Sequence, residues 1–233
     1  MLVDLDATLL DGTAFPDSIA QTCRRLVIER RDLDADRLVR ANRDAWSRYW
    51  PGVESQWALG TLDSASLRLE SWRRTLALCG CHDDALAQLA SDTHAALARE
   101  TYCLFDDAHD LAATAAARGI RLGLLSNGAG DVQRDKLGVL GIADWFEVVV
   151  VSGEIGYAKP DPSLFQVALD QLAAPPGVVW HVGDDLQTDV AGARAAKVTA
   201  VWLNRSREAR QSRDPVPDLE VASLRELADL LRD

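Results

Sequence analysis

The stretch IRLGLLSNG at residues 120–128 is the clearest indication of how this chain folds. A mostly apolar run is followed at once by a serine, an asparagine and a glycine. Similar short runs occur at 146–151, 178–182 and 198–203, and segments with helical spacing separate them. Strands that are apolar on both faces and alternate with helices are typical of a parallel sheet covered on both sides. We therefore predict an α/β core built on a parallel sheet.

A long helical segment interrupts this pattern after the first strand. Residues 14–101 show apolar positions at helical spacing and contain no compelling strand. Asp63 and Asp83 stand where helix N-caps are expected, and about four helices should form. The predicted organisation is a core of residues 1–13 and 102–233, with residues 14–101 inserted as a helical domain.

Composition limits the classes of partner. The chain has 233 residues with 36 acidic and 25 basic side chains, for a net charge of −11. This balance argues against binding to a nucleic-acid polymer or an anionic membrane, since both require a basic face. No apolar run reaches the length of a membrane-spanning helix. Four cysteines are too few for a disulfide scaffold, so a reduced, cytoplasmic location is expected.

Charged and hydroxyl side chains stand at or just beyond the ends of the predicted strands. In an open parallel sheet the carboxyl ends of the strands form the ligand site, so these side chains should meet. Crowded carboxylates require a cation, and oxygen ligands favour Mg²⁺. Lysine, serine and backbone N–H groups suit the oxygens of a phosphate. The residues concerned are Asp4, Asp6, Ser126, Asn127, Lys159, Asp184 and Asp189.

These residues resemble the four motifs of the haloacid dehalogenase superfamily of phosphohydrolases, whose fold is a Rossmann-like core with a helical cap after the first strand. The stretch DLDATL at 4–9 is similar to the first motif, and the others are matched in order along nearly the whole chain. Further short matches resemble the subgroup that holds N-acylneuraminate-9-phosphatase and pyrimidine 5′-nucleotidase. These further matches are SNG at 126–128, Gln133, Lys136-Leu137, SGE at 152–154 and KPDP at 159–162.

The resemblance implies hydrolysis of a small phosphate monoester. In this family Asp4 would attack phosphorus and form an aspartyl-phosphate, as a carboxylate nucleophile can. Asp6 would protonate the leaving oxygen and then activate the hydrolytic water. Ser126 and Lys159 would bind the transferring phosphoryl group, with help from the Asn127 backbone.

The resemblance also implies a Mg²⁺ site. The Asp4 carboxylate, the backbone carbonyl of Asp6 and the carboxylate of Asp184 would hold the ion, and Asp189 would support it. Asp185 could anchor the site lysine or cap the following helix. The chain departs from the family at residue 7, where an alanine replaces the usual glycine in a turn. The first strand is short, because few residues precede Asp4.

Several alternatives stay open. A phosphomutase would share the core motifs, and a haloacid dehalogenase would share the fold but lacks a carboxylate at the position of Asp6. A phosphonatase would need a cap lysine, and residues 14–101 contain none. A non-catalytic binding module on this fold would not require all these residues. The sequence leaves open which ester is cleaved and whether the protein is a monomer or a homodimer.

Overall fold

The apolar runs pair into one six-stranded sheet in the computed structural model, which describes residues 1–232. All neighbouring strands are parallel, in the order β5-β4-β1-β6-β7-β8, so the predicted α/β Rossmann-like class is confirmed. Residue 178, predicted as strand, lies instead in a 3₁₀ turn (Pro176–Val178). The strands are β1 (Leu2–Val3), β4 (Gly123–Ser126), β5 (Val148–Val151), β6 (Trp180–Gly183), β7 (Thr199–Leu203) and β8 (Leu219–Val221).

The short strand β1 occupies the centre of this sheet. It spans two residues, and Val3 lies opposite Leu124 of β4 and Val182 of β6. The backbone N–H of Asp4 extends this pairing with a 3.0 Å hydrogen bond to the carbonyl oxygen of Val182. The chain therefore places Asp4 between the carboxyl ends of the two neighbouring strands.

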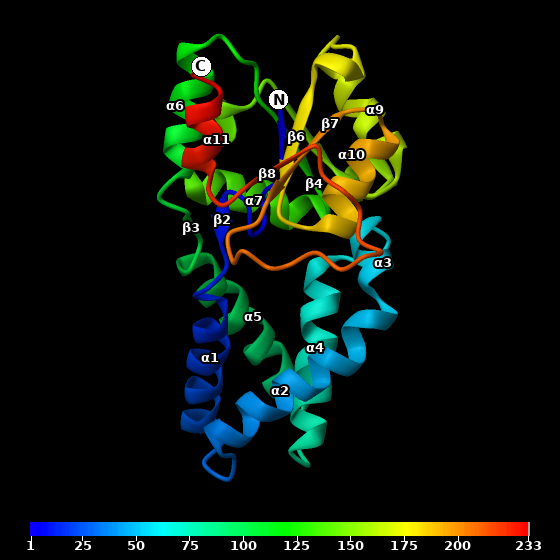
Figure 1. The fold of residues 1–233 in the computed structure, drawn as a ribbon. Coiled ribbons are helices and arrows are strands. Elements are labelled where there is room, and N and C mark those ends of the chain that lie inside the picture. The colour runs from blue at the N-terminus through cyan, green and yellow to red at the C-terminus, as the bar shows by residue number, and fades with distance from the viewer. Residues whose placement is uncertain (233) are drawn as a thin grey trace. The chain divides into compact units, whose positions relative to one another are not determined.

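Helices cover both faces of the sheet. Figure 1 shows α6 and α11 on one face and α9 and α10 on the other. Leu164 and Phe165 of α9 are fully buried against the sheet, where they contribute to a continuous apolar core. A π-helical turn (Leu186–Val190) leads directly into α10. The helices are α6 (Ala108–Ala117), α7 (Gly130–Leu140), α8 (Ser152–Ile155), α9 (Pro162–Gln171), α10 (Ala191–Ala195) and α11 (Leu224–Leu230).

The chain forms two compact units. The core unit comprises Met1–Asp11 and Cys103–Asp233, and the helical unit comprises Gly12–Tyr102. The chain leaves and re-enters the core unit through an antiparallel pair, β2 (Leu10–Asp11) and β3 (Cys103–Leu104). The helical unit contains α1 (Phe15–Glu29), α2 (Ala35–Tyr49), α3 (Glu54–Ala58), α4 (Ser64–Leu78) and α5 (Asp84–Glu100).

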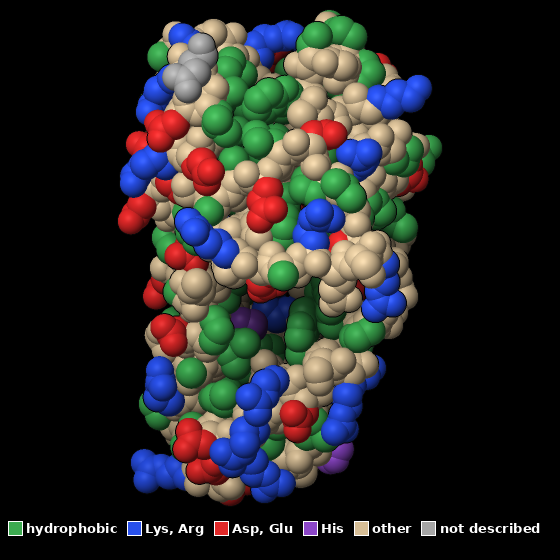
Figure 2. Space-filling model, viewed as in Figure 1, with side chains coloured by type: hydrophobic (Ala, Val, Ile, Leu, Met, Phe, Trp, Pro, Cys, Tyr) green, Lys and Arg blue, Asp and Glu red, His purple; other side chains and the backbone are tan. Residues whose placement is uncertain are grey.

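The helical unit has its own apolar core. Trp72 of α4 is fully buried in it, together with Cys23 and Leu38 from α1 and α2. The predicted caps are confirmed, since Asp63 and Asp83 each accept a hydrogen bond from a backbone N–H in the first turn that follows. Figure 2 shows Lys and Arg side chains (blue) gathered over α2 on the visible face of this unit. Within residues 1–232, no helix is long and apolar enough to cross a membrane.

Candidate active site

Three carboxylates meet at the carboxyl ends of the central strands. Asp4 follows β1, Asp184 follows β6, and Asp189 lies in the π-helical turn beyond β6. One oxygen from each lies within 4.8 Å of the others, and Asp4 and Asp189 are buried. The strand topology thus brings together residues that lie far apart in the sequence, at the edge of the sheet where ligands bind in such folds.

Lys159 joins two of these carboxylates. Its Nζ lies 2.6 Å from Oδ1 of Asp4 and 2.7 Å from Oδ1 of Asp189, with 3% of its side chain exposed. The Asn127 side chain fixes the backbone of this lysine, because its Oδ1 accepts from the Lys159 N–H at 2.8 Å and its Nδ2 donates to the Lys159 carbonyl at 3.0 Å. The sequence suggested only a backbone role for Asn127, so its side-chain role is an addition from the structure.

Asp189 is held on several sides. His181 Nε2 lies 2.8 Å from its Oδ1, and the backbone N–H of Asp185 donates to its Oδ2 at 3.2 Å. A Cβ on Gly183 would lie 2.2 Å from the Asp189 carboxyl carbon, so only a glycine leaves room for this carboxylate. Lys159 Nζ contacts the same Oδ1 as His181, so Asp189 orients the lysine. Both Asp189 oxygens already accept hydrogen bonds from protein donors.

Asp185 caps the helical turn that follows it, which is the second of the two roles expected for this residue. Its Oδ1 accepts from the backbone N–H groups of Gln187 at 2.8 Å and Thr188 at 2.7 Å, which caps the π-helical turn. The group that anchors Lys159 is Asp189. His181 lies behind the site through its contact with Asp189.

Burial and charge perturb the acid–base properties of the cluster. Burial raises the pKa of Asp4 to about 8 against the opposing effect of Lys159, and it raises the pKa of Asp184 to about 6 with help from Asp189. Burial would also raise the pKa of Asp189, but the charge of Lys159 and the hydrogen bond with His181 outweigh it and lower that pKa. The pKa of Lys159 is raised, because the two carboxylates overcome the effect of its burial.

The residues present fit a hard divalent cation. An attacking carboxylate must be ionised, and a cation beside Asp4 and Asp184 would favour the ionised form of both. The donors are all oxygen, as Mg²⁺ prefers. Asp4 offers the oxygen that Lys159 does not contact, and Asp184 lies with its Oδ1 3.4 Å from Thr8 Oγ1. Asp4 and Asp184 would hold the ion, while Asp189 would act through Lys159.

The side chain of Asp6 turns toward α7. Its Oδ1 lies 2.6 Å from Lys136 Nζ, and its Oδ2 accepts from Gln133 Nε2 at 2.8 Å. Gln133 Nε2 also lies 2.7 Å from Ser126 Oγ, so it links two residues expected to act on the substrate. From the sequence, Gln133 and Lys136 are only points of resemblance to the subgroup. Their helical spacing of three was the signal that could have paired them.

Ala7 stands where the family usually has a glycine, and its backbone adopts a conformation that favours glycine. Its φ is 57°, in the left-handed region, where a Cβ costs about 1–2 kcal/mol relative to the right-handed conformation. The turn is nevertheless closed by hydrogen bonds, from Ala7 N to the Leu10 carbonyl at 3.0 Å and from Leu10 N to the Leu5 carbonyl at 2.8 Å. The first motif therefore keeps its turn with an alanine in place of glycine.

The comparison with known families agrees with this geometry. A sequence model of the family described as haloacid dehalogenase-like hydrolase matches residues 1–197. This chain belongs to the haloacid dehalogenase-like hydrolase family. A phosphoserine phosphatase of Thermus thermophilus is 39% identical over 187 residues, which cover 78% of this chain and 71% of that protein. N-acylneuraminate-9-phosphatase of Mus musculus is 38% identical over 114 residues, which cover 48% of this chain and 46% of that protein.

Solved structures of haloacid dehalogenase-like proteins share the fold. The putative HAD-hydrolase YfnB from Bacillus subtilis, bound to magnesium, superposes with a TM-score of 0.69 at 22% identity, covering all of this chain and 97% of that one. L-2-haloacid dehalogenase from Xanthobacter autotrophicus gives a TM-score of 0.68 at 20% identity, covering 99% of this chain and 97% of that one. At these identities the likeness is one of fold.

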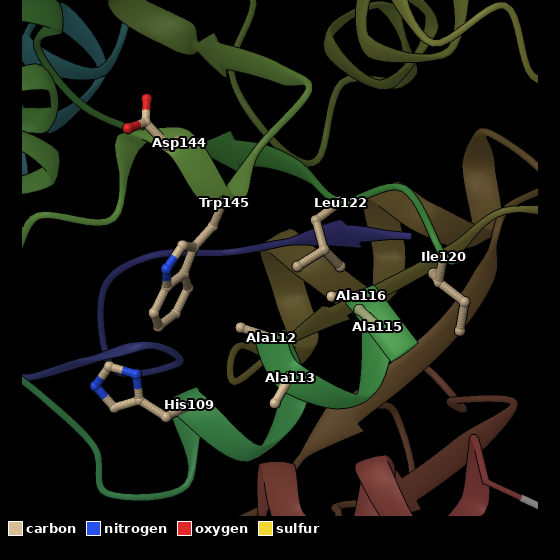
Figure 3. A pocket seen from close by; sticks show the side chains of 9 residues that line it. All are labelled: His109, Ala112, Ala113, Ala115, Ala116, Ile120, Leu122, Asp144 and Trp145. Atoms are coloured by element: carbon tan, nitrogen blue, oxygen red, sulfur yellow. The ribbon is translucent and has the colours of Figure 1, made fainter. Parts of the chain in front are cut away.

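A separate hollow lies on the core unit of this haloacid dehalogenase-like hydrolase. It has a volume of about 480 Å³ and is lined by alanines of α6 with His109, Trp145 and Leu122 (Figure 3). Leu122 precedes β4 and Trp145 precedes β5, so the hollow lies at the amino ends of these strands. Its lining is mainly apolar, and it lies at the edge of the sheet opposite the acidic cluster.

Proposed function

We propose that this hydrolase is a phosphatase that cleaves small phosphate monoesters through an aspartyl-phosphate formed on Asp4, with Mg²⁺ as cofactor. The observation that supports this most directly is the buried contact between Asp4 and Lys159, with Asp184 beside it. A carboxylate, an ammonium and a second carboxylate at one point can receive a phosphoryl group and offset its charge. The phosphatase names of the most similar sequences agree with this proposal.

The reaction has two displacements at phosphorus. In the first, an oxygen of Asp4 bonds to phosphorus, the ester P–O bond breaks, and the leaving oxygen takes a proton from Asp6. In the second, water attacks the phosphorus of the aspartyl-phosphate and Asp6 accepts a proton from it. Inorganic phosphate leaves and the Asp4 carboxylate is restored. Asp6 thus acts as acid and then as base.

The remaining side chains bind and balance charge. Lys159 would contact the transferring oxygens, Asn127 would fix its backbone, and Ser126 Oγ would donate a hydrogen bond. When bound between Asp4 and Asp184, Mg²⁺ supplies positive charge that offsets the carboxylates and the phosphoryl oxygens.

Release of phosphate from p-nitrophenyl phosphate, with and without Mg²⁺, tests the proposal. Asp4→Asn should lower kcat by about 10³-fold or more, because the nucleophile is removed. Asp44→Asn on the exposed face of α2 is the matched control and should retain turnover. Chelation by EDTA should abolish activity and added Mg²⁺ should restore it. Equal turnover by Asp4→Asn and the wild type would reject the proposal.

Dehalogenation is the alternative suggested by several structural neighbours, which are named L-2-haloacid dehalogenases. The carboxylate of Asp6 favours phosphate ester hydrolysis, because an acid is needed to protonate an alkoxide but not a halide. Measurement of halide release from 2-chloropropionate separates the two. Release faster than phosphate ester turnover would favour the dehalogenase.

A further inference from the structure

We propose that Gln133 and Lys136 of α7 are positioning residues that hold the Asp6 carboxylate for its acid–base role and set its place relative to Ser126. This inference rests on the proposed phosphatase function. Neither side chain belongs to the four motifs, and neither has a role in the reaction proposed above. Both lie within the core unit, on one face of one helix.

Each oxygen of the Asp6 carboxylate has its own donor on α7. Lys136 Nζ lies 2.6 Å from Oδ1, and Gln133 Nε2 lies 2.8 Å from Oδ2. The Asp6 side chain is 39% exposed, whereas that of Lys136 is 8% exposed and Gln133 is fully buried. An exposed aspartate would otherwise sample several rotamers. Two donors that are fixed by burial restrict it to one orientation, as precise catalysis requires.

The burial of Lys136 needs an explanation that helix packing does not supply. Moving an ammonium out of water costs several kcal/mol unless a partner compensates it. Its ion pair among residues 1–232 is with Asp6, a residue that is itself partly open to solvent. An apolar residue at position 136 would avoid this cost. The position therefore indicates that a cation is required next to Asp6.

Gln133 connects this aspartate to the phosphate-binding region. Its Nε2 also contacts Ser126 Oγ at 2.7 Å and the carbonyl oxygen of Asn127 at 3.1 Å. A carboxylate and a carbonyl can only accept hydrogen bonds, so the amide nitrogen must face them. One side chain thus fixes the separation between Asp6 and Ser126. That separation sets how far the proton of Asp6 lies from the leaving oxygen once the phosphoryl group is bound.

Dependence on the leaving group distinguishes positioning of an acid from a structural role. Lys136→Met should lower kcat/KM, which reports the steps up to departure of the leaving group, by about 30-fold for glycerol phosphate, whose alkoxide needs a proton. This loss is part of the roughly 10²–10⁴-fold that a general acid contributes. The loss for p-nitrophenyl phosphate, whose leaving group departs without a proton, should stay within about threefold. Lys197→Met, a substitution of an exposed lysine of the same unit, is the control and should leave both rates unchanged.

A double-mutant cycle with Asp6→Asn completes the test. If Lys136 acts through Asp6, Lys136→Met should cost nothing further for glycerol phosphate once Asp6 is asparagine. Gln133→Leu should behave in the same way. Should Lys136→Met fail to fold by circular dichroism, Lys136→Gln keeps a neutral donor and replaces it in the cycle.

Equal losses for the two substrates, or losses that add in the Asp6→Asn background, would overturn the positioning role while leaving the phosphatase proposal intact. A wild-type protein that releases no phosphate from either ester overturns the phosphatase proposal and this inference with it.

Discussion

His94 should make the stability of the helical unit depend on pH. Its Nδ1 accepts a hydrogen bond from the indole Nε1 of the fully buried Trp72, 3.2 Å away, and the rings meet edge to face. Protonation would place a second hydrogen between the two nitrogens and break this bond. Burial, with a smaller contribution from Arg68, lowers the pKa of His94 from 6.5 to about 4.

The sign and size follow from proton binding. Between pH 6.5 and 4 the unfolded chain binds a proton at His94 that the folded chain does not, so folding stability falls as the pH falls. The full effect of this lowered pKa is about 3 kcal/mol. Between pH 8 and pH 5 it is about 2 kcal/mol, equivalent to about 4–8 °C in melting temperature for a chain of this size.

Urea unfolding at pH 8 and pH 5, for the wild type and His94→Gln, measures this term. Glutamine offers an acceptor to Trp72 and does not titrate, so the stability difference between wild type and variant should shift by about 2 kcal/mol toward the variant at pH 5. His82→Gln, which removes an exposed imidazole from the same unit, should follow the wild type at both pH values. A wild-type-minus-His94→Gln difference that is the same at pH 5 and pH 8 would refute the reasoning.

Other buried groups give predictions for stability and turnover. In Gly183→Ala the new Cβ would lie 2.2 Å from the carboxyl carbon of Asp189, whose oxygen contacts Lys159. We expect the free energy of unfolding to fall by about 1–3 kcal/mol and kcat to fall strongly, measured by thermal melting and by phosphate release. Arg205→Met removes two 2.9 Å bonds to the buried Asp107, and should lower the unfolding free energy by about 3–5 kcal/mol in urea. Thr75→Val leaves the buried amide of Asn42 without its 3.0 Å acceptor, at a cost of about 1–3 kcal/mol, whereas Thr75→Ser should retain stability.

The convergence of the acidic side chains could be predicted because parallel strands fix where their ends lie. Asp4, Asp184 and Lys159 each follow a recognisable strand or loop. Right-handed crossover connections in a parallel sheet of this strand order bring the carboxyl ends of the strands together. The partner of Lys159 could not be predicted. Asp185 and Asp189 are both close in sequence to Asp184, and only the π-helical turn decides that Asp185 points to the helix start and Asp189 points under the lysine.

The contacts of α7 could not be predicted from the sequence either. Spacing places Gln133 and Lys136 on one face of a helix, but it does not say what that face meets. Asp6 lies in a loop whose course depends on the left-handed backbone of Ala7, and this conformation is unusual for alanine. The strand β8 was missed for a related reason. It is short and follows a long irregular segment, so the sequence carries little periodic signal for it.

The use of lysine and arginine in this chain follows the chemistry of the two cations. Twenty-two of the 25 basic residues are arginine, yet the two cations buried beside Asp4 and Asp6 are lysines. A guanidinium is a planar fork suited to one carboxylate, as in the paired bonds from Arg205 to Asp107. An ammonium is compact and can contact two carboxylates from one atom, as Lys159 does at 2.6 and 2.7 Å. A site proposed to hold a phosphoryl group and a metal as well has room for the smaller cation, and two of the three lysines stand where the chemistry is proposed to occur.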